Sequence, residues 1–131
     1  LLTFALDGKV TPPKQPDPYI PRPILEAGFK LDENLAALGA TLYGDHGCSF
    51  CHGADARAGG MTPDLRASAI PLTEMEGAFA SVVRGGDRVA RGMPGYPDLT
   101  DKELHALRQY IRQMAHKALN AEEDSRLGGT R

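Results

Sequence analysis

The sequence has no tryptophan, only four phenylalanines and four tyrosines, and only two cysteines in 131 residues. Such a thin supply of large side chains is unusual for a domain core, and small domains often need a cofactor or a cross-link to hold their fold. The length fits one small domain with extensions and leaves no room for a separate catalytic domain. Both cysteines belong to one short motif, so no structural disulfide is expected elsewhere.

Signals for two kinds of partner are also missing. The 15 basic and 17 acidic residues are interspersed, with a formal net charge of −2, so there is no basic stripe for nucleic acid. No apolar run approaches the ~20 residues that a helix needs to span a bilayer. Residues 1–4 lack the basic region of a signal peptide, and the first residue is not methionine. We expect no nucleic-acid partner, no membrane span, and a mature product or a piece of a longer protein.

The most specific pattern is the run Cys-Ser-Phe-Cys-His at residues 48–52. C-x-x-C-H is the local signature for covalent attachment of a c-type haem. Cys48 and Cys51 lie on one side of a helical turn, where their sulfurs can form thioethers with the two vinyl groups of the macrocycle. His52 is then expected to ligate the iron. The alternatives are a redox dithiol or half a zinc site, but there is no βαβ pattern or second ligand pair, and His52 would have no role.

Met93 is the best candidate for the sixth iron ligand. It lies in residues 91–97, whose glycines and prolines exclude a helix, and Pro94 favours an extended backbone at Met93. A methionine ligand raises the potential and suits a one-electron carrier, whereas an open position suits oxygen chemistry or gas sensing. The alternative for Met93 is a surface turn in which its side chain packs on a neighbour.

Other sulfur and imidazole side chains are weaker candidates for the sixth ligand. Met61 is too near His52 in sequence to reach the far face of the ring, and Met75 and Met114 fall in expected helices, where methionine usually packs. A bis-histidine haem would need one of the three remaining histidines: His46, His105 or His116.

Three segments have the pattern of helices. Residues 33–46 follow a capping Asp32, a second helix begins at Thr73, and a third runs from residue 100 to about 119. The second and third begin with Thr-x-x-Glu capping boxes, so the acidic pairs in their first turns favour the helix dipole and do not indicate acid–base catalysis. The irregular stretch of residues 53–71 between helices is expected to wrap a functional object.

The N-terminal part has a different composition. Residues 1–10 predict a lone strand that ends at an Asp-Gly turn. Residues 12–23 contain six of the ten prolines, which predicts an extended, semi-rigid linker. A proline-rich arm packed on the domain surface is the alternative. At the other end, polar residues from 120 to 131 predict a flexible tail.

The motif at residues 48–52, the Met93-Pro94 loop and the last helix together resemble class I cytochrome c domains over residues 32–119. This resemblance implies an all-α fold in which three to five helices surround one covalently bound haem c. It implies one-electron transfer through haem, so the chain alone is not an enzyme. In that family a proline carbonyl orients the ligand histidine through a hydrogen bond, and Pro63 is the expected counterpart. A plain turn proline is the alternative.

An arginine near the end of the second helix and Tyr96 are further candidates for contact with the haem. Arg84, Arg88 and Arg91 lie between the second helix and the Met93 loop, and arginine suits forked contacts with carboxylates such as the haem propionates. Arg84 is the best of them because it lies at a helix end, although a solvated loop is equally consistent. Tyr96 is expected to line the haem edge or to bind a propionate, or else to be an ordinary half-buried tyrosine.

The closer resemblance is to the C-terminal haem domain of quinohaemoprotein alcohol dehydrogenases. In these enzymes a β-propeller that carries pyrroloquinoline quinone (PQQ) ends in a strand, followed by a proline-rich linker and a cytochrome domain. The corresponding parts are residues 1–10 as the propeller's last strand, 11–31 as the linker, 32–119 as the cytochrome domain and 120–131 as the tail.

This closer resemblance implies partners as well as a fold. The electron donor would be a PQQ dehydrogenase domain, and PQQ and calcium are expected only in that missing domain. The acceptor would be a small redox protein, either a cytochrome or a blue copper protein, or an electrode-like acceptor. A monomer in the periplasm is expected. The competing functions are a five-coordinate haem with peroxidase or gas-sensing activity and a free-standing soluble cytochrome c.

Overall fold

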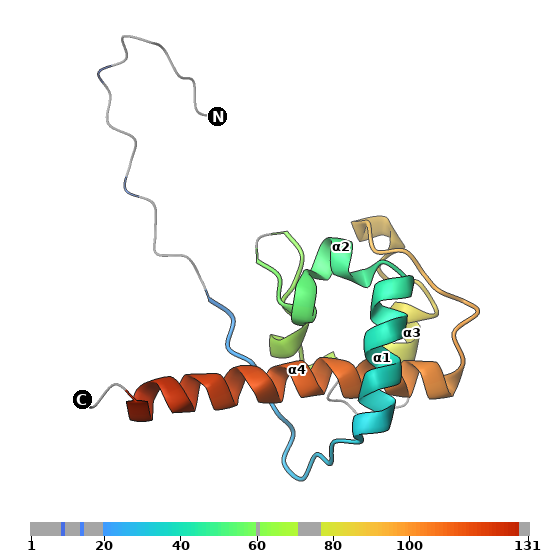
Figure 1. Ribbon diagram of the computed structural model, residues 1–131. Coiled ribbons are helices and arrows are strands. Elements are labelled where there is room, and N and C mark those ends of the chain that lie inside the picture. Colours follow the sequence, from blue (N-terminus) through green and yellow to red (C-terminus); the bar gives the residue numbers. More distant parts are fainter. Residues whose placement is uncertain (1–8, 10–13, 15–19, 60, 71–76, 129–131) are drawn as a thin grey trace.

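The computed structural model describes residues 9, 14, 20–59, 61–70 and 77–128. Within these residues the chain is helical and has no strand (Figure 1), which confirms the predicted all-α fold. Nearly all of the expected strand of residues 1–10, and the expected start of the second helix at Thr73, lie outside the described residues. The described elements are helices α1 (Glu33–Asp45), α2 (Cys48–His52), α3 (Ala78–Val83) and α4 (Asp101–Gly128), and the 3₁₀ turns η1 (Ala54–Ala56), η2 (Leu65–Ala67) and η4 (Val89–Arg91).

Helix α1 begins at the predicted cap. The side chain of Asp32 accepts a hydrogen bond from the backbone N–H of Leu35 at 3.0 Å, which satisfies one of the N–H groups that a helix start leaves unpaired. The helix ends at Asp45, and the N–H of His46 donates to the carbonyl of Leu42 at 3.0 Å. Gly47 follows and turns the chain toward α2.

The core lies where α1 crosses α4 (Figure 1). A β-carbon at Gly39 would lie 2.0 Å from the carbonyl oxygen of Ala106, so the two backbones meet at a position that only glycine can occupy. One turn further along, the rings of Tyr43 and Tyr110 are stacked at a tilt with centroids 5.0 Å apart. The buried apolar residues of the two helices are Ala36, Gly39, Leu42 and Tyr43 of α1, and Leu104, Ala106, Leu107, Tyr110, Ile111, Met114 and Ala115 of α4.

Helix α4 begins as predicted but is longer than expected. The hydroxyl of Thr100 accepts from the N–H of Glu103, and the Glu103 carboxylate accepts from the N–H and the hydroxyl of Thr100, which is a complete capping box. The helix then continues to Gly128, through most of the expected flexible tail. Residues 117–127 contain neither glycine nor proline and are rich in strong helix formers, so the helix continues although residues 120–126 are exposed to solvent.

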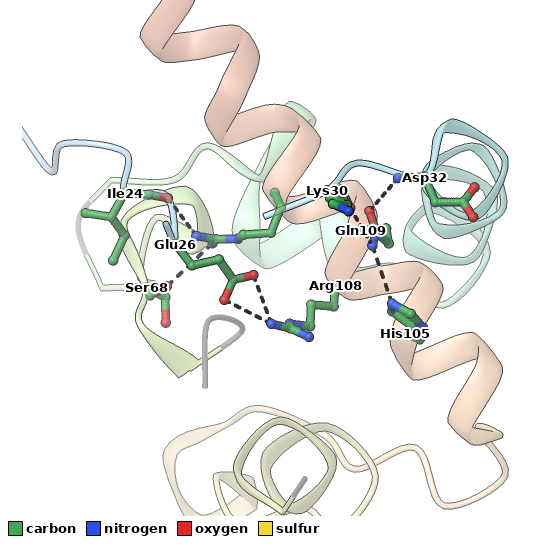
Figure 2. A network of polar contacts seen from close by, with 9 residues as sticks. Ile24, Glu26, Lys30, Asp32, Ser68, His105, Arg108 and Gln109 are labelled. Atoms are coloured by element: carbon green, nitrogen blue, oxygen red, sulfur yellow. Dashed lines mark hydrogen bonds and ion pairs between the residues drawn. The ribbon is translucent and has the colours of Figure 1, made fainter. Parts of the chain in front are cut away.

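Residues 20–32, which we call the strap, begin at the end of the proline-rich stretch and pack on α4 (Figure 2). The carboxylate of Glu26 binds Arg108 at 2.9 Å, and the side chain of Gln109 accepts from the N–H of Asp32 at 3.0 Å. The C-terminal half of the expected linker therefore packs on the domain surface. This is the alternative of a surface-packed arm, in place of an extended linker. None of the described helices has the length and apolarity required to cross a membrane.

Candidate functional site

The C-x-x-C-H run forms the short helix α2, with a glycine at each end. Gly47 caps its start with a φ of 69°, and Gly53 follows its end with a φ of 71°. A β-carbon at Gly53 would lie 2.1 Å from the carbonyl oxygen of Arg57, so the chain can turn sharply after the motif only with glycine there. Cys48 and Cys51 are both free thiols, and Cys51 is exposed. Their spacing of three residues places them on one side of the helical turn.

The surroundings of Cys48 raise the pKa of its thiol and do not favour the thiolate. Burial raises its pKa, with a smaller raising effect from Cys51, although a backbone hydrogen bond acts in the opposite direction. The reactive cysteine of a dithiol oxidoreductase has a lowered pKa, because the thiolate is the nucleophile. Among the described residues there is also no group of three or more His, Cys, Asp or Glu side chains arranged to hold a metal ion.

His52 is buried and its ring is oriented by a backbone carbonyl. Its Nδ1 lies 3.0 Å from the carbonyl oxygen of Pro63, and 8% of the residue is exposed. A neutral imidazole that donates from Nδ1 keeps its lone pair on Nε2, which is then the nitrogen available to a metal. The hydroxyl of Thr62 donates to the carbonyl of Cys51 at 2.6 Å. Two adjacent residues of one loop are thus bound to α2.

The loop that carries Pro63 is held by an ion pair that the sequence analysis missed. The guanidinium of Arg66 makes two parallel hydrogen bonds with Asp64, at 2.9 and 2.6 Å, and the N–H of Arg66 donates to the same carboxylate at 3.0 Å. Asp64 is 5% exposed, and this contact raises the pKa of Arg66. An Asp directly after proline and two residues before Arg is a local signal for such a turn.

Met93 lies in a turn that is not an α-helix, as predicted for residues 91–97. The 3₁₀ turn η4 ends at Arg91 and is followed by Gly92, whose φ is 90°, and the N–H of Met93 donates to the carbonyl of Arg88 at 3.2 Å. Three residues later the N–H of Tyr96 donates to Val83, the last residue of α3, at 2.9 Å. Met93 is half-buried and packs against the core.

The other candidates for a sixth ligand lie in different environments. Met61 is fully exposed, and Met114 is buried in the α1–α4 core; Met75 lies outside the described residues. The ring of His46 lies edge-on to Tyr96, with centroids 5.3 Å apart. His105 is exposed, and the ring of His116 lies beside Phe29 with centroids 5.9 Å apart.

Arg84 and Tyr96 are already bound to other parts of the protein. The Nη1 of Arg84 donates to the carbonyl of Leu99 at 3.2 Å and to the carboxylate of Asp101 at 2.8 Å, so it joins the end of α3 to the start of α4. The hydroxyl of Tyr96 donates to the carbonyl of His46 at 3.0 Å, and burial raises its pKa. These contacts give both side chains a structural role, and neither contact was predicted from the sequence.

The donor set is chemically suited to a c-type haem. It offers two thiols one helical turn apart, an imidazole whose Nδ1 is engaged and whose Nε2 remains, and a half-buried thioether in a separate turn. Imidazole and thioether together are the axial ligands of His/Met cytochromes. Phe50, inside the motif, is 91% exposed, which is unusual for a phenylalanine and consistent with a site whose edge meets solvent.

Comparisons with known proteins agree with this chemistry. Residues 34–111 match the family described as "Cytochrome C oxidase, cbb3-type, subunit III". The chain is 38% identical over 85% of its length to a quinohemoprotein alcohol dehydrogenase, ADH IIB, of Pseudomonas putida. It is 31% identical over 99% of its length to a lupanine 17-hydroxylase [cytochrome c] of Pseudomonas sp. Over 96% of its length it is 32% identical to the dehydrogenase subunit of an alcohol dehydrogenase (quinone) of Komagataeibacter europaeus.

The chain spans only a small part of these curated relatives. It covers 16% of the Pseudomonas putida protein, 18% of the lupanine hydroxylase and 17% of the Komagataeibacter subunit. No solved structure gave a significant match.

Proposed function

The chain belongs to the cytochrome c family described as cbb3-type cytochrome C oxidase subunit III, and on this premise we propose that it transfers single electrons through one haem c ligated by His52 and Met93. The haem would be attached through Cys48 and Cys51. The observation that carries the proposal is the hydrogen bond of 3.0 Å between Nδ1 of His52 and the carbonyl of Pro63, because it leaves Nε2 for the iron. The chain is an electron-transfer domain and not itself a catalyst.

Each site residue has a distinct task in this proposal. The bound haem c supplies a one-electron iron couple. Pro63 fixes the tautomer and the orientation of the His52 ring and makes its free nitrogen a better donor. The thioether of Met93 favours ferrous iron and raises the potential. A bound methionine also closes the distal position, which disfavours the alternative of a five-coordinate haem with peroxidase or gas-sensing activity.

The relatives suggest where the electrons come from. We propose that residues 1–10 are the last strand of a preceding dehydrogenase domain, that residues 11–31 join it to the cytochrome domain at residues 32–119, and that PQQ and calcium belong to the dehydrogenase domain. A reduced quinone carries two electrons, so the haem would accept and pass on one electron twice per substrate oxidised. The name of the Pseudomonas putida relative, a quinohemoprotein alcohol dehydrogenase, pairs a quinone with a haem protein and supports this assignment.

We propose a small redox protein, a cytochrome or a blue copper protein, as the acceptor, and the periplasm as the compartment. An electrode would be able to replace the acceptor. The net charge of −2 favours docking through apolar contact at the haem edge with weak dependence on salt. Phe50 is an exposed side chain within the motif that is available for such contact.

An alkaline pyridine haemochrome spectrum of the denatured protein tests the covalent attachment. We expect the spectrum of a haem with both vinyl groups saturated, and we expect it to be lost in the double variant Cys48→Ser, Cys51→Ser. A protein that yields no covalent haem would refute the proposal. Rapid binding of carbon monoxide to the reduced, untreated protein would instead favour the five-coordinate alternative.

In the full-length protein, anaerobic addition of an alcohol substrate should reduce the haem c when PQQ is bound and leave it oxidised when PQQ is withheld. Reduction that does not depend on PQQ would contradict the proposed donor.

A further inference from the structure

Arg112, in the middle of α4, is completely buried, with none of its surface exposed. Burial is the main cause that lowers its pKa, to about 10, so it is still charged at neutral pH. A buried charge is unfavourable unless its hydrogen bonds are made. An apolar side chain of similar length would fill the same space, so packing alone does not explain an arginine here.

Among the described residues, this guanidinium donates its hydrogen bonds to backbone carbonyls from two segments far away in sequence. Its Nη1 donates to Ile24 of the strap at 2.8 Å. Its Nη2 donates to Leu65 at 2.8 Å and makes a longer contact of 3.5 Å with Ser68; these residues begin and follow the η2 turn. Its Nε has no partner among the described residues.

The strap and the turn that share this guanidinium also lead directly to the histidine. The N–H of Ile24 donates to the carbonyl of Arg66 at 3.0 Å, and the side chain of Arg66 is bound in turn to Asp64. Asp64 directly follows Pro63, whose carbonyl faces Nδ1 of His52. Hydrogen bonds, together with the short stretch of chain from Pro63 to Arg66, therefore connect the strap to the ring of His52.

We propose that Arg112 is a positioning residue for His52, and that it couples the seating of the strap to the reduction potential of the haem. Its planar fork holds carbonyls of the strap and of the turn at once, which fixes the loop that presents the Pro63 carbonyl to Nδ1. The proposal rests on the proposed function, because His52 must be the iron ligand for its orientation to matter.

The direction of the effect follows from the hydrogen bond to the ring. A carbonyl that accepts firmly from Nδ1–H makes the imidazole a stronger donor and stabilises ferric iron, which lowers the potential. A loop released from Arg112 holds this hydrogen bond less well, so the potential rises. Lysine cannot replace the arginine fully, because a single ammonium lacks the geometry of the fork.

The test compares two positions of α4, three residues apart, that both hold the strap. Arg112→Met and Arg112→Lys release the turn as well as the strap. The matched control is Gln109→Leu, which loosens the strap at its other end, where Gln109 binds Asp32 and Lys30. For each haem-loaded protein we would measure the potential by redox titration, the exchange rate of the His52 Nδ1 proton by NMR, and the covalent haem content by pyridine haemochrome.

We expect Arg112→Met to shift the redox equilibrium toward ferrous haem by up to about tenfold, which is about 59 mV for one electron. The Nδ1 proton of His52 should also exchange faster in Arg112→Met. Arg112→Lys should recover part of both effects. Gln109→Leu should lower the stability of the protein without changing the potential. Ile24→Pro removes the N–H that donates to Arg66 without altering a helix, and it keeps the test open if Arg112→Met does not fold. It should raise the potential relative to Ile24→Val.

If the Arg112 variants retain covalent haem and their potential and proton exchange are unchanged, the proposal is overturned while the proposed function stays intact. If the Arg112 variants do not fold, the same result in Ile24→Pro has the same meaning. An equal rise of the potential in Gln109→Leu would also overturn it, because general loosening would then explain the effect. A wild-type protein without covalent haem would overturn the proposed function and this inference together.

Discussion

The crossing of α1 and α4 predicts an unusual penalty for the substitution Gly39→Ala. In an exposed helix this change normally stabilises, because alanine exceeds glycine in helix propensity by about 1 kcal/mol. Here the new β-carbon would lie 2.0 Å from the carbonyl oxygen of Ala106 and 2.9 Å from Cβ of Tyr110. The obstacle is backbone of the facing helix, so no side-chain rotation relieves it.

The size of the penalty follows from the separation that the helices must gain. Real β-carbons essentially never approach another heavy atom within 3.0 Å, so the contact at Ala106 must open by about 1 Å. Overpacking of a well-packed core costs about 1–3 kcal/mol, and a rigid backbone obstacle places this case at the upper end. After the gain in helix propensity, we expect a net loss of about 2 kcal/mol in the free energy of unfolding.

The assay is urea unfolding of the haem-loaded protein, followed by circular dichroism. Gly44→Ala on the same helix is the matched control, because a β-carbon there meets nothing within 4 Å; it should leave stability unchanged or raise it. If Gly39→Ala is as stable as the wild type while Gly44→Ala behaves as expected, the helices do not cross this closely and the reasoning is wrong.

Three other changes have defined outcomes. Tyr96→Phe removes the hydrogen bond to the carbonyl of His46 and should lower the free energy of unfolding by about 1 kcal/mol; no loss in urea unfolding would contradict this. Hydrogen bonds from the backbone N–H and the hydroxyl of Thr100 lower the pKa of Glu103, so its stabilising contribution is present above its unfolded pKa and disappears as the pH falls through the lower folded value. The stability difference between wild type and Glu103→Gln should therefore vanish in acid, and a difference that is independent of pH would refute this account. Gly53→Ala forces a β-carbon against Arg57 at a positive φ, so its yield of covalent haem should fall severalfold in the haemochrome assay, whereas Gly59→Ala, where a β-carbon meets nothing within 4 Å, should keep the wild-type yield.

Features that depend on neighbours in the sequence were predictable. The Asp32 cap and the Thr100–Glu103 capping box each involve groups three residues apart, so residue type and spacing were sufficient to find them. The same holds for the motif in α2 and for the absence of a helix around Met93, where glycine and proline restrict the backbone. The family resemblance added the all-α arrangement around a haem.

Contacts between segments that are far apart in the sequence produce no local sequence pattern, so they could not be predicted. Arg112 is separated from Ile24 by 88 residues and from Leu65 by 47, and in the sequence it is one more charged residue beside an apolar stripe. Arg84 stays a candidate for contact with a haem propionate, but its ion pair with Asp101 was not predictable, because no periodicity relates the two positions. The length of α4 exceeds the prediction for another reason: polar residues favour a flexible tail, but residues 120–127 contain no glycine or proline that would end the helix.

The ligation of the haem is tested most directly by the sulfur-to-iron charge-transfer band of the oxidised protein. We predict that the band is present in the wild type, absent in Met93→Ala, and retained in Met61→Ala, where the replaced side chain is fully exposed. A band that survives in Met93→Ala would show that Met93 is not the ligand, and a wild-type protein without the band would contradict His/Met ligation altogether.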